Sequence, residues 1–227
     1  MGLLNDPHLE SLLDRLHGQS AAQNDAIESY FTRRAREGTL DSREFDDETH
    51  RFMSDKFIAL DRDKSELCYQ LCRAVRAKRV VEAGTSFGVS TLYLAAAVRD
   101  NIQRDGGTGV VIGTEHEREK VRVARAHFAE AGLADVIDLR EGDLRETLSG
   151  VGGRVDFLLL DIWVPMARPA LELVFPALRP GAIVIADNTE QFREAYHEYF
   201  EFVNAREHGL RTMTLPFPGG LELTVRD

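Results

Sequence analysis

The spacing of hydrophobic positions divides the chain into two regions. Before about residue 78 the hydrophobic residues recur at helical spacing. The clearest stripe comprises Leu9, Leu12, Leu13 and Leu16. Asp6 and Pro7 stand before it and suit a helix cap followed by a first helical proline. We predict further helices around 27–31 and over 64–77, whereas 38–63 is acidic and reads as irregular. Residues 1–78 are therefore expected to form a helical extension packed on the rest of the chain.

From Arg79 onward, short β-rich runs alternate with helical segments. Strands are predicted near 79–83, 109–114, 135–140, 155–161 and 181–186, and helices near 90–100, 117–131, 143–149, 167–178 and 190–208. This alternation indicates a parallel sheet with helices on both faces. Residues 79–227 are expected to form one doubly wound α/β core.

The end of the chain departs from that alternation. Two β-rich runs, 210–215 and 221–225, are joined by only the five residues 216–220. So short a link cannot cross over between parallel strands, so these two strands must be antiparallel. The pattern predicts a mostly parallel sheet that is closed by an antiparallel C-terminal hairpin.

Composition narrows the class of protein. The chain has 227 residues, of which 43% are hydrophobic, which suits one sizeable core. A net charge of −10 argues against nucleic acid as a partner. No apolar run has membrane-spanning length and no signal peptide is recognisable, so a cytoplasmic protein is expected. Cys68 and Cys72 lie four apart in a helical pattern and read as small apolar residues on one helix face.

The most informative stretch is the glycine loop that follows the strand at 79–83. It reads Glu82-Ala83-Gly84-Thr85-Ser86-Phe87-Gly88-Val89-Ser90. Its spacing is neither the dinucleotide fingerprint nor a P-loop. Glu82 suits a ligand ammonium and Ser90 a carboxylate, the two groups on the methionine half of S-adenosylmethionine. The alternative is a tight strand-to-helix turn in another α/β protein.

Later strand ends add polar residues at the edge where open α/β sheets bind ligands. Glu115 is placed to accept hydrogen bonds from ribose hydroxyls, or else is an acid favoured by a helix N-terminus. Its neighbour His116 is either close to the cofactor or exposed. Gly142-Asp143 offers a carboxylate to an adenine amino group, or simply a helix cap.

Three oxygen ligands follow two adjacent strands, namely Asp161, Asp187 and Asn188. Two carboxylates and an amide suit a hard cation such as Mg²⁺. The alternative is that Asp187 and Asn188 cap a helix beginning near Thr189.

With these residues in view, the chain resembles the class I S-adenosylmethionine-dependent methyltransferases. Within that class it is similar to the cation-dependent O-methyltransferases of the catechol and caffeoyl-coenzyme A type. The resemblance covers about 45–227 and is carried by the glycine loop, Glu115, Gly142-Asp143, Asp161-Ile162-Trp163, Arg179-Pro180-Gly181, Ala186-Asp187-Asn188 and the chain end.

The resemblance implies a seven-stranded sheet, a homodimer, and a small-molecule methyl acceptor. It also implies that S-adenosylmethionine is bound by the glycine loop and by acids at the strand ends. These residues are Glu82, Gly84, Thr85, Ser86, Gly88, Ser90, Glu115, Gly142, Asp143 and Asp161. A divalent cation, Mg²⁺ by expectation, would be held by Asp161, Asp187 and Asn188. Trp163 would pack on the cofactor, unless it is a core residue at a strand end.

The chain departs from the family where the general base is expected. The family commonly places a lysine at the position of Val164, and valine cannot accept a proton. His50 and His116 are the weak candidates for a base, and each reads equally as a surface residue. The expected function is cation-assisted O-methylation of a small molecule. Its rivals are metal-independent methylation of another acceptor such as nitrogen, and a cofactor-binding protein without catalysis.

Overall fold

A computed structural model describes residues 2–39 and 46–227. Its centre is a seven-stranded sheet with the order β3-β2-β1-β4-β5-β7-β6. The strands are β1 (Arg79–Ala83), β2 (Val110–Glu115), β3 (Ile137–Glu141), β4 (Val155–Leu160), β5 (Leu178–Asp187), β6 (Leu210–Leu215) and β7 (Leu221–Arg226). Strand β7 runs antiparallel to both β5 and β6, while the other pairs are parallel. The predicted fold class, with its C-terminal hairpin, is confirmed.

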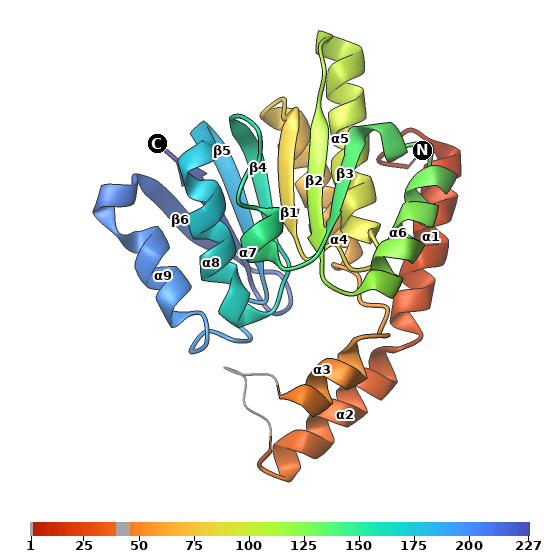
Figure 1. Cartoon of the computed structure of the whole chain (residues 1–227), viewed down its shortest axis with the longest axis vertical. Helices are drawn as coiled ribbons and strands as arrows, with labels where there is room; N and C mark the ends of the chain where they lie inside the picture. The colour runs from red at the N-terminus through yellow and green to blue at the C-terminus, as the bar shows by residue number, and fades with distance from the viewer. Residues whose placement is uncertain (1, 40–45) are drawn as a thin grey trace.

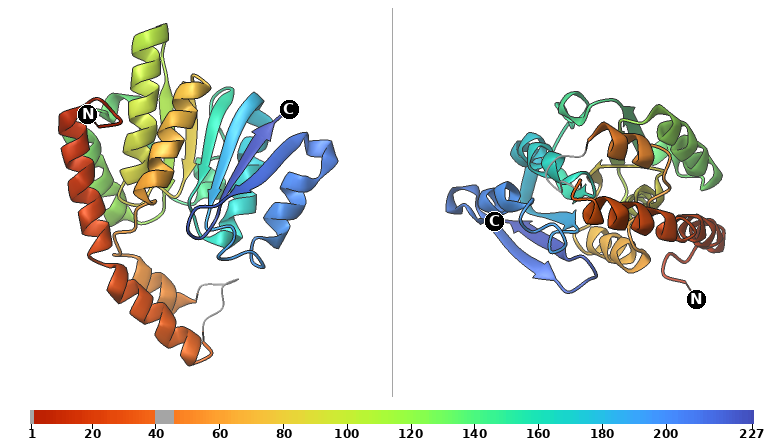
Figure 2. Two further views of the ribbon diagram at one scale, coloured as in Figure 1. Left: turned by 180° about the vertical axis from the view of Figure 1, so that it is seen from behind. Right: turned by 90° about the horizontal axis from the view of Figure 1, so that it is seen from below.

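Helices cover both faces of this sheet (Figures 1 and 2). The α-helices of the described residues are α1 (Pro7–Ala21), α2 (Asn24–Arg36), α3 (Asp47–Met53), α4 (Arg62–Ala74), α5 (Val89–Asp105), α6 (Arg118–Glu130), α7 (Leu144–Thr147), α8 (Val164–Val174) and α9 (His197–Asn204), and all but α2 and α3 lie on the faces of the sheet. Alternate residues of β1 enter different hydrophobic clusters. Val80 joins the cluster with α1, α4, α5 and α6, and Val81 the cluster with α7, α8 and α9. This alternation follows from the two-residue period of a strand that is buried on both faces.

Two local predictions are wrong. The helix expected over 190–208 begins only at His197, because turns precede it and the Gly219 carbonyl accepts the N–H groups of Glu190 and Gln191. The segment 38–63 was expected to be irregular, yet it contains α3, which starts where the side chain of Asp46 accepts from the Thr49 N–H. Part of that segment, 40–45, lies outside the described residues.

The N-terminal helices occupy two positions. Helices α1 and α4 pack against α5, and the predicted cap of α1 is present, since Asp6 accepts from the Leu9 N–H. Helices α2 and α3 instead lie beyond the edge at which β1, β2 and β4 end (Figures 1 and 2). Their mutual contact includes the stacked rings of Tyr30 and Phe52, whose centroids are 3.8 Å apart. In the described ranges no helix is long and apolar enough to span a membrane.

Candidate functional site

The predicted cofactor and metal residues lie at or just after the ends of β1 to β5, and these strand ends face α2 and α3 (Figure 1). Strand order places the loop after β1 between the ends of β2 and β4. The loop is tied to both neighbours. The N–H of Thr85 donates to the Thr114 carbonyl (3.0 Å), and the N–H of Asp161 donates to the Ala83 carbonyl (3.1 Å). Residues from far apart in the sequence therefore form one edge.

Glu82 faces the glycine loop as expected, but it lies beneath the loop and is fully buried. Its carboxylate accepts hydrogen bonds from the hydroxyls of Ser90 (2.6 Å), Thr85 (3.0 Å) and Thr91. Burial raises the pKa of Glu82, although these hydroxyls favour its charged form. Both carboxylate oxygens of Glu82 accept hydrogen bonds. Glu82 and Ser90 therefore hold the glycine loop against the first turn of α5.

The two loop glycines are required by close packing. Gly84 has a φ of +97°, and a Cβ there would lie 2.0 Å from the Asp161 carbonyl oxygen. Gly88 has a φ of +84°, and a Cβ there would lie 2.4 Å from the Phe128 ring. Both angles also disfavour any side chain. The loop can thus lie close to β4 and α6, which leaves its backbone free to approach a ligand.

Ser86 lies between these glycines in a left-handed conformation, with a φ of +49°. Its N–H donates to Glu115 Oε2 at 2.8 Å, while Glu115 Oε1 accepts from the N–H of Glu117. The N–H of Gly142 donates to the Glu115 carbonyl at 3.0 Å. Glu115 therefore contacts two other predicted cofactor residues, Ser86 and Gly142. Within the described ranges the buried Ser86 hydroxyl has no hydrogen-bond partner, which suits a polar ligand.

Asp143 follows β3 and caps α7, accepting from the N–H of Arg145. It also pairs with the Arg145 guanidinium, and this bond lowers the pKa of Asp143 to about 2. The capping alternative is therefore confirmed, whereas contact with adenine stays a prediction. His116 is exposed, which is one of the two predicted outcomes for it.

The predicted metal ligands are close together, and a lysine lies among them. The ammonium of Lys64, from the first turn of α4, is 2.7 Å from Asp187 Oδ1 and 3.1 Å from Asp61 Oδ2. Asp187 Oδ2 accepts from the Asn188 amide at 3.0 Å. Burial, followed by the charge of Asp187, holds the pKa of Asp161 well above its usual range.

The donor set as it stands does not fit a divalent cation. Both oxygens of Asp187 already have donors, and the amide nitrogen of Asn188, rather than its oxygen, faces the carboxylate. In the described part of the chain, no three or more His, Cys, Asp and Glu side chains form a group that could hold a metal ion, and the predicted set contains only two side chains of these types, Asp161 and Asp187. The capping alternative for Asp187 and Asn188 is wrong in its stated form, because the next helix of the described residues, α9, begins only at His197. Instead, Asn188 adopts a φ of +58°, a conformation that asparagine tolerates.

Lys64 is the residue that the sequence analysis missed. A signal was present, because Lys64, Cys68 and Cys72 recur every four residues on one face of the predicted helix. Both cysteines are free and buried, as predicted, and Lys64 is only 1% exposed. A lysine on an apolar helix face needs a buried anionic partner.

On the α3 side of the edge, the exposed His50 ring lies against Trp163, with centroids 5.8 Å apart. Trp163 is partly buried and follows β4. Because His50 belongs to α3, the ring contact places α3 near the end of β4. Val164 is the first residue of α8 and is buried in the cluster with Leu160 and Ala167. The position of the family lysine therefore belongs to the core of this chain.

A second set of contacts joins α3 to the glycine loop. The Phe57 ring stacks on Phe87 of the loop, with centroids 4.4 Å apart and planes 9° apart. The Lys120 ammonium donates to the Met53 carbonyl at the end of α3 (3.1 Å). The segment after α3 is thus fixed to the same loop that would meet the cofactor.

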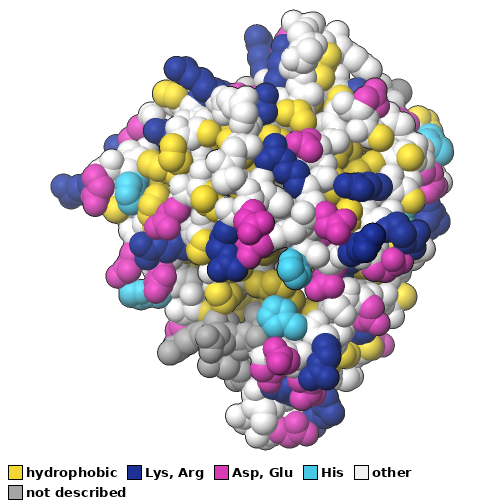
Figure 3. Space-filling view, viewed as in Figure 1, with side chains coloured by type: hydrophobic (Ala, Val, Ile, Leu, Met, Phe, Trp, Pro, Cys, Tyr) yellow, Lys and Arg dark blue, Asp and Glu magenta, His cyan; other side chains and the backbone are white. Residues whose placement is uncertain are grey.

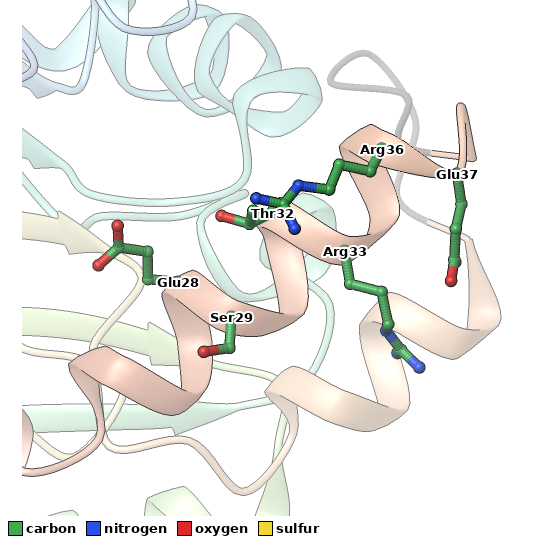
Figure 4. Close-up of a pocket in the computed structure, with 6 residues that line it drawn as sticks. All are labelled: Glu28, Ser29, Thr32, Arg33, Arg36 and Glu37. Atoms are coloured by element: carbon green, nitrogen blue, oxygen red, sulfur yellow. The ribbon is translucent and has the colours of Figure 1, made fainter.

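The surface at this edge can be followed in Figure 3, where hydrophobic and histidine side chains gather between the sheet edge and the α2–α3 pair. A shallow pocket of about 490 Å³ runs along α2 itself (Figure 4). It is lined by Glu28, Ser29, Thr32, Arg33, Arg36 and Glu37. None of these is a predicted site residue, so the pocket lies outside the constellation at the strand ends.

Known proteins resemble the chain in this same region. The sequence family described as "Methyltransferase domain" matches residues 81–189, from the end of β1 to just beyond β5. A catechol O-methyltransferase of Mycobacterium tuberculosis is 29% identical over 58% of this chain and 57% of its own length. A caffeoyl-CoA O-methyltransferase of Eucalyptus globulus is 27% identical over 56% of this chain and 51% of its own. The chain thus matches little more than half the length of these relatives.

Among solved structures, an O-methyltransferase from Bacillus cereus in complex with SAH has a TM-score of 0.70. The match covers 96% of this chain and 91% of that one, at 18% identity. This likeness establishes the shared fold, N-terminal helices included.

Proposed function

Because the chain belongs to the class I S-adenosylmethionine-dependent methyltransferases, in the family of the catechol and caffeoyl-CoA O-methyltransferases, we propose that it methylates a hydroxyl oxygen of a small molecule. One observation carries this proposal. The family match covers 81–189, and the same stretch supplies the polar residues that converge at the carboxyl edge of the sheet.

S-adenosylmethionine, when bound, supplies an electrophilic methyl group on its sulfur. The chain's own residues bind and orient the reactants, and this positioning is most of what such a transfer needs from a protein. We assign the ribose hydroxyls to Glu115 and polar contacts to the Ser86 hydroxyl, which has no partner in the described ranges. Gly84 and Gly88 keep the loop free of side chains where a ligand approaches.

The acceptor side is formed by the end of β4 and by α3. Trp163 and His50 lie in contact there, and we propose that they border the acceptor. Methyl transfer to a hydroxyl oxygen would release the hydroxyl proton, so the acceptor side needs a residue that can take it. Histidine is a common general base, so we propose the exposed His50 for this role.

The divalent cation implied by the family remains a prediction. Asp161, Asp187 and Asn188 are adjacent, but Lys64 and the Asn188 amide already occupy Asp187.

The test is titration calorimetry with S-adenosylhomocysteine, followed by turnover on a panel of catechols, phenols, alcohols and amines, with and without a chelator. We expect cofactor binding and methylation of hydroxyls. Methylation confined to amines would favour the nitrogen-acceptor rival, and binding without any turnover would favour the non-catalytic one. Failure of well-folded protein to bind the cofactor would refute the proposal. The homodimer also remains an expectation, which sedimentation of the same sample tests.

A further inference from the structure

The observation that the proposed function leaves unexplained is the ammonium of Lys64. A lysine that is 1% exposed is rare, because burial strongly disfavours an isolated charge. Here the ammonium has two carboxylate partners from opposite sides, Asp187 at 2.7 Å and Asp61 at 3.1 Å. It therefore lies between the start of α4 and the end of β5, inside the constellation predicted to hold a metal.

We propose that Lys64 supplies the positive charge that the resemblance assigns to a divalent cation, so that this methyltransferase works without a bound metal. This inference rests on the proposed function for its catalytic part, whereas its binding part stands on the geometry alone. Lys64 is a positioning residue in this account, since it acts through Asp187.

The carboxylate of Asp187 is already occupied by hydrogen-bond donors. Asp187 Oδ1 is bonded to Lys64 and Oδ2 to the amide of Asn188, so both oxygens face donors. A cation that took Asp187 as a ligand would have to share the carboxylate with the ammonium. Two positive charges on one buried carboxylate repel each other strongly, because little solvent screens them.

The surroundings of the Lys64–Asp187 ion pair hold both residues in place. Asp187 is 6% exposed, and its carbonyl accepts from the buried Tyr196 hydroxyl at 2.9 Å. Lys64 lies in the first turn of α4, three residues after Asp61, with which it forms an ion pair. The ammonium cannot move into solvent without leaving a buried carboxylate unpaired, which is costly.

Lys64 also sets the charge around Asp187. Its ammonium is the cation in contact with both Asp187 and Asp61, and its removal would leave Asp187 beside Asp161 without that positive charge. Neighbouring carboxylates are typical ligands of a hard divalent cation. Removal of the ammonium should therefore create the very site that the family resemblance implies.

The experiment measures Mn²⁺ binding to the wild-type chain by electron paramagnetic resonance, with turnover in chelator as a parallel measurement. We expect no stoichiometric Mn²⁺ site, and turnover unchanged by the chelator. One tightly bound Mn²⁺ per chain, with turnover lost on chelation, would overturn the proposal. Protein that neither binds the cofactor nor turns over would defeat the proposed function, while the Mn²⁺ measurement would still decide the role of Lys64.

Variants sharpen the result. Lys64→Met removes the charge at similar length, and we expect it to bind Mn²⁺ at least about tenfold more tightly than the wild type. Lys64→Arg keeps the charge and should bind no more Mn²⁺ than the wild type. Lys78→Met is the control, because Lys78 precedes β1 and bonds the Gly106 carbonyl, at the opposite end of the strands from the cluster. Equal Mn²⁺ affinity in folded Lys64→Met and wild-type protein would count against the proposal. If Lys64→Met does not fold, the wild-type measurement decides alone.

Discussion

Replacement of Gly84 by alanine tests whether the glycine loop is as tightly packed as the structure indicates. The backbone there has a φ of +97°, which costs a side-chain-bearing residue about 1–2 kcal/mol. The new Cβ would also lie 2.0 Å from the Asp161 carbonyl oxygen and 2.9 Å from its carbon. Because both neighbours are backbone, the strand ends must shift, which adds about 1–3 kcal/mol of overpacking.

We therefore expect Gly84→Ala to lower the free energy of unfolding by about 2–5 kcal/mol, a large share of an ordinary domain's stability of about 5–15 kcal/mol. The matched control is Gly132→Ala. Gly132 has a φ of +65° with no atom within 4 Å of its would-be Cβ, so it isolates the conformational cost.

Urea unfolding followed by circular dichroism gives both free energies, and calorimetry with S-adenosylhomocysteine gives the affinity of each variant. We expect Gly84→Ala to lose more stability than Gly132→Ala, and to bind the cofactor more weakly because the loop and Asp161 have moved apart. Equal losses in the two variants would refute the reasoning, since the contact with Asp161 would then cost nothing.

Three further predictions concern single side chains. Glu115→Ala should weaken cofactor binding by about 1–3 kcal/mol in calorimetry, with the exposed Glu119→Ala as its control, because Glu115 holds Ser86 and is assigned to the ribose. Glu82→Gln should remove a pH dependence. Burial raises the pKa of Glu82 above 4.5, so the unfolded state loses its proton first and wild-type stability should fall, relative to the variant, as pH rises above that value. Identical pH profiles in urea unfolding would contradict this account. Val164→Lys should destabilise the fold by about 1–3 kcal/mol without adding a base, since it buries an ammonium in the core at a helix start. A gain in turnover on weakly acidic alcohols would show instead that the new lysine reaches the acceptor.

The sequence by itself determined the fold class and the edge at which the site lies. Alternating strand and helix patterns, together with the short link over 216–220, were enough to predict a mostly parallel sheet with an antiparallel last pair. These features follow from local periodicity and chain geometry, which a sequence displays directly. The helix over 190–208 was not decided locally, because the carbonyl of the distant Gly219 satisfies N–H groups at its predicted start.

Only the tertiary structure decided what each polar residue of the site bonds to. The sequence proposes Glu82 as a ligand contact, and the fold adds that three hydroxyls donate to it. It proposes Asp187 as a metal ligand, and the fold adds that Lys64, 123 residues earlier in the first turn of α4, donates to it. Strand order determines which distant side chains meet, and burial then requires each charge among them to find a partner. Pairings of this kind depend on chain segments far apart, so periodicity and motif spacing cannot reveal them.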